Sequence, residues 1–292
     1  MINTPQKDKY KLDNDVTYLN TAYSAPLSIE AERIGLKALS NKCKPYELNS
    51  SDFFEPVEKL KTLFAQLIDV PNPQNIAVIP SVSYGIATVA NNVCLKKGDE
   101  ILIVGEQFPS NVYSWKRVAD KNKVKIITVS APYNKVNRGK EWNKNILDAI
   151  NKNTAVISVP NIHWTDGTIF KLKAIREVAT QNNALLIIDG TQSIGALPFS
   201  VKETKPDAVV CAGYKWLMGP NSIGLAYFGE YFKKGIPLEE NWINRKKSED
   251  FSGLVNYEDG YKEGAFRYNV GEMSNFNLAP ILTKTIEQLT TE

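Results

Sequence analysis

The sequence has very little histidine and cysteine, and each scarcity excludes a class of site. With a single histidine, His163, a histidine-rich metal site is impossible and a serine triad is disfavoured. The three cysteines, Cys43, Cys94 and Cys211, are far apart and form no CxxC pair, so neither a disulfide framework nor a zinc knuckle is expected. No metal is therefore predicted, and a reducing, cytoplasmic environment fits this use of cysteine best.

Strong charge imbalance and long apolar runs are also absent. Lys and Arg total 35 and Asp and Glu total 32, which leaves a net charge of +3 on 292 residues. Since no basic block stands out, nucleic acid is not an expected partner. The polar N-terminus has no apolar core of a signal peptide, and no run approaches the length of a membrane span, so a membrane association is not expected either.

Short β-branched runs recur from residue 76 onward, with stretches of helical length between the early ones. Most of these runs are apolar on both faces, as parallel strands covered by helices on both sides should be. The pattern predicts an α/β fold with three layers and a doubly wound, mostly parallel sheet of seven strands. The last two connections are shorter, which favours one late antiparallel strand. The predicted strands are residues 76–79, 101–104, 125–129, 155–159, 184–189, 207–212 and 222–228.

The segments that flank this sheet have a different character. Two helices are expected before it, and the spacing from Asp52 to Glu55 predicts a capping box at the start of the second. Residues 230–275 are rich in charge, aromatic side chains and glycine and have no clear period, so they are predicted to form long loops near a site or an interface. A last helix is expected to begin near residue 277.

Ligands of open parallel sheets bind beyond the carboxyl ends of the strands, so the residues after each strand are the candidate site. After the first strand, Val82 and Ser83 lie at a helix start, where backbone amides can hold a phosphate, although an ordinary serine N-cap explains this stretch as well. After the second strand comes Phe108, which either packs in the core or stacks on a flat ligand ring. His163, after the fourth, is at least as well explained as a hydrogen-bonded structural residue.

The strongest signal is an acid and a lysine on successive apolar strands. Asp189 closes the fifth strand and is costly to bury without a cationic partner. Lys215 follows the sixth strand, between Tyr214 and Trp216. A structural salt bridge, with the lysine stem lying on aromatic rings, is one interpretation. The other is a desolvated, reactive amine.

The combination of these pieces matches the needs of pyridoxal 5′-phosphate. This cofactor requires a lysine that binds its aldehyde, a carboxylate against its pyridine nitrogen, a phosphate-binding turn and a flat side chain on which its ring stacks. Each piece is common alone, but the ordered set is not.

The sequence resembles the class V aminotransferase-fold family, within the fold-type I pyridoxal-phosphate enzymes. The likeness extends from about residue 18 to about residue 280. Its most specific stretches are GDEILI, QFPSNVYSW, HWTDGT, IIDGTQSIGALP and GYKWLMGP. The resemblance implies that Lys215 is the catalytic aldimine lysine and that Asp189 pairs with the pyridine nitrogen. It also implies that Phe108 stacks on the ring, that Gln192 contacts the ring hydroxyl, and that Val82, Ser83 and Tyr214 hold the phosphate.

Departures from the family pattern bear on the reaction. Cysteine desulfurases of the family usually carry histidines where this chain has Phe108 and Tyr214, and Ala212 replaces a common phosphate-binding hydroxyl. Sulfur relay through a cysteine persulfide is therefore disfavoured, and the residues look more like those of kynureninase or isopenicillin epimerase relatives. The family's small C-terminal domain, which usually supplies a substrate-clamping arginine, is largely missing here. Arg267 is a possible substitute, but an anchoring role in its loop is favoured.

The resulting expectation is a cytoplasmic enzyme of the aminotransferase class V type that acts on an amino acid or amine. A Cβ lyase, either a carbon-sulfur lyase or a kynureninase-like hydrolase, is the alternative enzyme, and a non-catalytic cofactor-binding protein is a third possibility. A homodimer is expected, and a partner chain could supply the missing C-terminal half. The predicted divisions are residues 1–70 (N-terminal helices), 71–275 (large cofactor-binding domain) and 276–292 (start of a shortened C-terminal domain).

Overall fold

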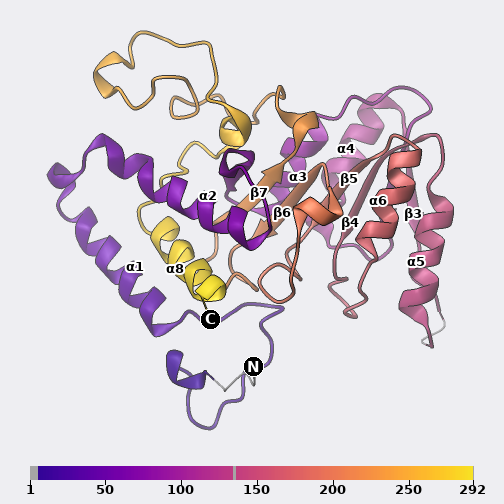
Figure 1. Ribbon diagram of the computed structural model, residues 1–292, viewed down its shortest axis with the longest axis horizontal. Coiled ribbons are helices and arrows are strands. Elements are labelled where there is room, and N and C mark those ends of the chain that lie inside the picture. Colours follow the sequence, from indigo (N-terminus) through magenta and orange to yellow (C-terminus); the bar gives the residue numbers. More distant parts are fainter. Residues whose placement is uncertain (1–5, 134–135, 292) are drawn as a thin grey trace.

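A computed structural model describes residues 6–133 and 136–291, and these residues form one seven-stranded sheet in the order β1-β7-β6-β5-β4-β2-β3 (Figure 1). Only β7 runs antiparallel to its neighbours β1 and β6, while the other pairings are parallel. The predicted fold class, including one late antiparallel strand, is confirmed. The strands are β1 (Ile76–Ile79), β2 (Glu100–Val104), β3 (Lys125–Val129), β4 (Thr154–Pro160), β5 (Leu185–Asp189), β6 (Ala208–Ala212) and β7 (Gly224–Phe228).

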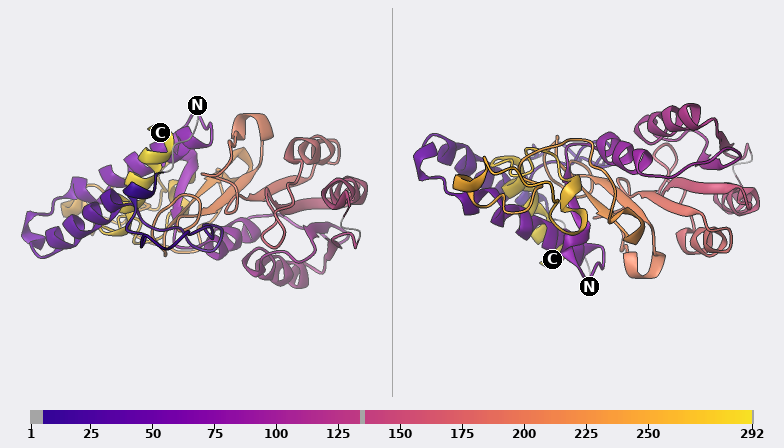
Figure 2. Two further views of the ribbon diagram at one scale, coloured as in Figure 1. Left: turned by 90° about the horizontal axis from the view of Figure 1, so that it is seen from below. Right: turned by 90° about the horizontal axis from the view of Figure 1, so that it is seen from above.

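Helices cover both faces of this sheet, which gives the three layers that the apolar strands require (Figure 2). On one face, α3 and α4 bury Trp115 against the sheet, and on the other, α5 and α6 bury Trp142. Both indole rings are fully buried, so each layer has an aromatic anchor. The helices are α1 (Ile29–Lys42), α2 (Glu55–Leu67), α3 (Val82–Asn91), α4 (Tyr113–Asn122), α5 (Arg138–Ala149), α6 (Leu172–Gln181), α7 (Val201–Thr204) and α8 (Leu278–Thr291).

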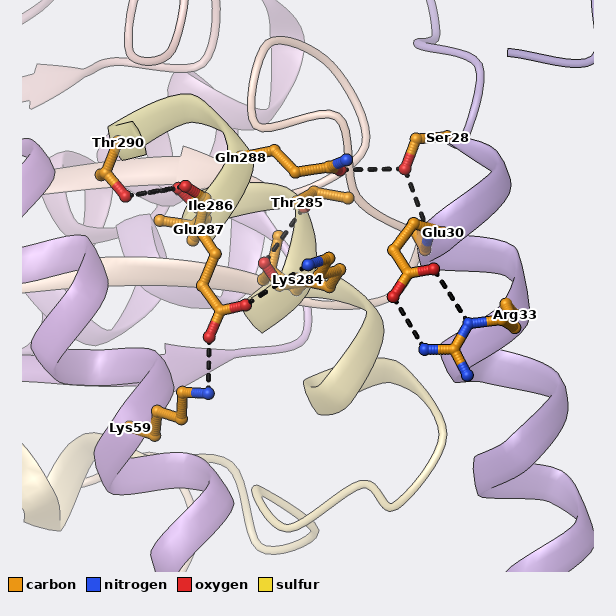
Figure 3. Close-up of polar contacts among 12 residues, drawn as sticks. Ser28, Glu30, Arg33, Lys59, Lys284, Thr285, Ile286, Glu287, Gln288 and Thr290 are labelled. Atoms are coloured by element: carbon orange, nitrogen blue, oxygen red, sulfur yellow. Dashed lines mark hydrogen bonds and ion pairs between the residues drawn. The ribbon is translucent and has the colours of Figure 1, made fainter. Parts of the chain in front are cut away.

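Helix α8 returns to the N-terminal helices, and it packs against both α1 and α2. Figure 3 shows the polar contacts that accompany this packing: the Ser28 hydroxyl donates to Gln288 Oε1 at 2.9 Å, and Lys59 Nζ lies 2.5 Å from Glu287 Oε1. Leu282 and Ile286 of α8 are fully buried in the same core as the sheet. Helices α1, α2 and α8 therefore pack together, and α8 also packs into the hydrophobic core of the sheet.

One local prediction is wrong. The stretch from Asp52 to Glu55 is not the capping box of α2, because the chain first makes a short 3-10 helix at Ser50–Phe53. Asp52 closes that turn, and its Oδ2 accepts a hydrogen bond from the Asn49 amide at 2.8 Å. Helix α2 then begins at Glu55 without a side-chain cap.

Residues 230–275 are mostly loop, as expected, with 3-10 turns at Glu230–Phe232, Phe251–Gly253 and Gly264–Tyr268. Among the helices in the described part of the chain, none combines the length and apolar character needed to cross a bilayer.

Candidate functional site

A cavity of about 250 Å³ lies at the carboxyl edge of the sheet. Its walls come from the ends of β4, β5 and β6, from the segments that follow β1, β2, β4, β5 and β6, and from Ser222 and Ile223, which precede β7. Convergence of these loops at one edge is a property of parallel strands, and it explains why residues far apart in sequence meet here. The seven predicted site residues all line this cavity: Val82, Ser83, Phe108, Asp189, Gln192, Tyr214 and Lys215.

Lys215 is the buried amine of this cavity. Its backbone lies in a tight turn after β6, in which the Met218 amide donates a hydrogen bond to the Lys215 carbonyl at 2.9 Å. The residue is only 7% exposed, and Nζ lies 5.4 Å from the centre of the Phe108 ring and 5.8 Å from that of Tyr214. Burial lowers the pKa of Lys215, although the charge of Asp189 opposes this shift. A lowered pKa increases the share of free amine, which is the nucleophilic form.

Asp189 ends β5 and is also 7% exposed. Its Oδ1 accepts a hydrogen bond from the Thr191 amide at 3.0 Å. Burial raises the pKa of Asp189, against the effects of the Thr191 hydrogen bond and the Lys215 charge. Within the described residues, no ion pair within 4.0 Å joins Asp189 to Lys215. The opposite charges of the two groups influence each other's pKa across the cavity, but the groups do not form the structural salt bridge that was the alternative.

The phosphate-type turn lies at the start of α3. Ser81 is an N-cap, since its hydroxyl accepts from the Tyr84 amide at 3.2 Å, and it also lies 2.9 Å from the Ser83 hydroxyl. The simpler interpretation of a serine N-cap is thus correct for Ser81. Val82 and Ser83 nevertheless begin the helix at the cavity wall, where the amides of the first turn and the helix dipole favour an anion. Tyr214 lines the same cavity, and burial raises the pKa of its hydroxyl.

Phe108 is held by Trp164, which was not predicted as a site residue. The Trp164 ring meets the Phe108 ring edge-on, with centres 5.4 Å apart and planes at 87°. The Trp164 indole N–H donates to the Glu106 carbonyl at 2.7 Å. Glu106 has a left-handed backbone (φ 51°), which is uncommon for a side chain of this kind, and it turns the chain between β2 and Phe108.

Gln192 joins three segments of the site. Its Nε2 donates to the Ala22 carbonyl at 3.0 Å, and its Oε1 accepts from the Trp216 indole at 3.0 Å. One N–H of the amide is left for a ligand, since an amide nitrogen carries two donors. Gln192 therefore lines the cavity and at the same time ties the N-terminal segment to the Lys215 loop.

A second hollow, which we call the outer compartment, opens from the cavity. The two share Phe108, Trp164, Gln192, Tyr214 and Lys215. The outer compartment is completed by Asn20, Ala22, Tyr23, Ser24 and Asn221. Residues 20–24 could not be predicted from the strand ends, because they precede β1 by more than fifty positions. The only available signal was that the family likeness begins near residue 18.

Two candidate residues of less certain role are structural. His163 is 1% exposed, bonds Thr165 Oγ1 at 2.9 Å and the Gly105 carbonyl at 3.1 Å, and packs on the Trp142 ring. Arg267 does not line the cavity. Its Nη1 donates to the Gly235 carbonyl at 3.2 Å, so it anchors its loop, as the favoured interpretation had it.

Comparison with known proteins identifies the family of this chain. The family model described as aminotransferase class-V matches residues 38–240. The uncharacterized aminotransferase YcbU of Bacillus subtilis is 25% identical over 76% of this chain and 56% of its own length. A probable cysteine desulfurase of Borreliella burgdorferi is 28% identical over 84% of this chain and 56% of its own length. The chain thus spans little more than half the length of these relatives.

Solved structures show the same fold. The cysteine desulfurase CsdA from Escherichia coli superposes with a TM-score of 0.81 at 17% identity, over 98% of this chain and 71% of that chain. The cystine C-S lyase C-DES, in complex with its reaction product cysteine persulfide, gives a TM-score of 0.81 at 17% identity, over 96% of this chain and 73% of that chain. Because the family model covers well over half of its residues, this chain belongs to the class V aminotransferase family.

Proposed function

We propose that the protein binds pyridoxal 5′-phosphate through Lys215 and acts on an amino acid or amine. The observation that carries this proposal is the position of the Lys215 amine, which is buried, has a lowered pKa and lies 5.4 Å from the centre of a cavity-lining aromatic ring. The family and the names of the relatives support it. When bound, the cofactor supplies a reactive aldehyde and a pyridine ring that draws electrons from the substrate Cα.

The residues present fit this group. Val82, Ser83 and Tyr214 would hold the phosphate, where a helix start faces the cavity. Asp189 would hold the protonated ring nitrogen, and a cation there would offset the burial that now raises the pKa of this carboxyl. Phe108 would cover one ring face, and the free N–H of Gln192 would serve the ring hydroxyl.

Lys215 is proposed to have two tasks. Its free amine would hold the cofactor by condensing with its aldehyde and releasing one water, and the same amine, once displaced by the amino group of the substrate, would move a proton at the substrate Cα. The lowered pKa suits both, because each task starts from the unprotonated amine. The neighbouring aromatic rings keep water from this amine, since Lys215 is 7% exposed.

Borohydride labelling tests the proposal with a matched control. Protein mixed with pyridoxal phosphate should absorb in the visible range, lose this band with borohydride, and carry the reduced label on the peptide that contains Lys215. Lys61 is the control, because it is also buried, has a pKa lowered by burial, and lies 4.6 Å from the Phe266 ring centre, but it is outside the cavity. No label, or equal labelling of Lys61, would refute the proposal.

A Cβ lyase, which removes the β substituent of the substrate, is the second candidate reaction. It is supported by the likeness to the cystine C-S lyase, whose name describes a reaction of this class. Product analysis separates the reactions: a keto acid that keeps its β substituent indicates transamination, and pyruvate or alanine plus a released group indicates a lyase.

We also propose that the protein is an isologous homodimer, as the family likeness implies. Sedimentation velocity across a hundredfold range of concentration tests this, and a monomer throughout would contradict it.

A further inference from the structure

The outer compartment differs from the cavity in its chemistry. The cavity holds Asp189 and the helix start at Val82, both of which serve the cofactor in the proposed function. The outer compartment is reached from the cavity past Lys215, which lines both. A substrate that meets the Lys215 amine from the outer side must therefore place its own side chain against the walls of this compartment.

Among the described residues that line the outer compartment, Lys215 is the one with a charged side chain. The others supply aromatic rings, two of them with phenolic hydroxyls, three amides, the Ser24 hydroxyl and the Ala22 methyl group. The amides of Asn20, Gln192 and Asn221 can bond a neutral or weakly polar group, but none of them can neutralise a charged side chain. A charged group that leaves water without a counter-charge pays a large desolvation cost.

Aromatic surface is the other feature of the outer compartment. The Trp164 ring lies at its wall and is 46% exposed, although its indole N–H bond to Glu106 and its contact with Phe108 fix its orientation. Tyr23 is 73% exposed and lines the same compartment. Large aromatic rings left open beside a reactive amine are surfaces on which a ligand can pack.

The segment that carries Tyr23 is held in place, so its ring is part of a formed wall. The Ala22 carbonyl accepts from Gln192, and the Ala25 amide donates to the Tyr214 carbonyl at 3.0 Å. The Tyr18 hydroxyl donates to the Ser24 carbonyl at 2.6 Å and closes the turn. The bonds to Gln192 and Tyr214 tie residues 22–25 to two of the segments that line the cavity, those after β5 and β6.

Resting on the proposed function, we propose that the outer compartment selects amino acids or amines with an uncharged aromatic side chain, which packs against Trp164 and Tyr23. Both are specificity-determining residues that contact the substrate side chain. The Trp164–Phe108 contact also links this wall to the ring proposed to stack on the cofactor, so the substrate ring and the cofactor ring would pack against one aromatic cluster.

Titration of the cofactor-loaded protein tests this inference by two readouts, the visible spectrum of the cofactor and the heat of binding. Phenylalanine, tyrosine, leucine, alanine, aspartate and lysine are compared. Phenylalanine and tyrosine should bind about tenfold more tightly than aspartate or lysine, with alanine between them. Equal or tighter binding of aspartate or lysine would overturn the inference.

Variants assign the selectivity to the two rings. Trp164→Ala should weaken phenylalanine binding about five- to tenfold and alanine binding less than twofold, while Trp164→Phe should restore most of the loss. Tyr23→Ala, at an exposed position where it cannot disturb the core, should weaken phenylalanine binding about threefold. Tyr46→Ala is the matched control, since Tyr46 is 80% exposed and outside the outer compartment. Equal weakening of phenylalanine and alanine by both ring variants would show that the rings do not select.

Failure of the inference and failure of the proposed function are distinguishable. If Lys215 takes no cofactor, the loaded protein does not form and both are refuted before any substrate is added. If Lys215 takes the cofactor and the amino acids show no preference, only the substrate class is refuted.

Discussion

Gly195 couples the loop after β5 to the loop that carries Lys215, and a single methyl group there should disturb both. Its backbone is left-handed (φ 98°), and a Cβ atom would lie 2.1 Å from the Trp216 carbonyl oxygen and 2.6 Å from its carbon. Because both of these are backbone atoms, no side-chain rotation relieves the contact. Gly195→Ala must therefore shift the residue that follows Lys215.

The chain offers a control for the backbone cost. Gly98 has the same φ of 98°, but a Cβ there would meet nothing within 4 Å. The positive φ costs an alanine about 1–2 kcal/mol at either position. Overpacking adds about 1–3 kcal/mol at Gly195 alone. We expect Gly98→Ala to lower the free energy of unfolding by about 1–2 kcal/mol and Gly195→Ala by about 2–5 kcal/mol.

Urea unfolding followed by tryptophan fluorescence measures the two free energies, and borohydride labelling measures cofactor attachment to Lys215. Gly195→Ala should reduce labelling more than tenfold under conditions where the protein is folded, while Gly98→Ala should label like the wild type. Equal destabilisation of the two variants, within about 0.5 kcal/mol, together with normal labelling, would refute the claim that this close approach positions the lysine.

Three further predictions concern buried ionisable groups. Because burial raises the pKa of Asp189, the free energy of unfolding of the cofactor-free protein should fall as pH rises from about 3.8 to the pKa of the folded state. Asp189→Asn should remove this fall in urea titrations at several pH values, and it should also weaken cofactor retention on dialysis. Because burial lowers the pKa of Lys61, the free energy of unfolding should rise as pH rises from the pKa of the folded state to about 10.5. Lys61→Met should flatten this rise, and an unchanged rise in the variant would contradict the prediction. His163→Ala should lower the free energy of unfolding by about 2–4 kcal/mol without changing Lys215 labelling of the folded protein; lost labelling would give His163 a role in the site.

Most of the sheet was predictable because every strand except the edge strand β3 is largely buried on both faces. Runs such as Ile76–Ile79 and Ala208–Ala212 are completely buried, and because polar side chains are costly to bury, these runs consist of apolar residues that can be recognised in the sequence. The same reasoning placed Asp189 and Lys215 at one edge, because polar residues after buried parallel strands must emerge together. The prediction failed at Asp52, where the same residues can form either a 3-10 turn or a helix cap: Asp52 closes a 3-10 turn instead of capping α2.

Local sequence pattern was enough to predict the fold class and to place Asp189 and Lys215 at one edge of the sheet, because strand periodicity and the edge rule depend only on neighbouring residues. Gln192 and Tyr214 were added to the candidate site by the family resemblance. The three-dimensional arrangement was needed to find that Asp189 and Lys215 remain separate, that the Trp164 ring packs on Phe108, and that residues 22–25 are tied to the Lys215 loop. Each of these findings concerns the relative positions of segments far apart in the chain. Such contacts depend on distances and angles that arise only when the sheet and its loops are assembled, so no local pattern encodes them.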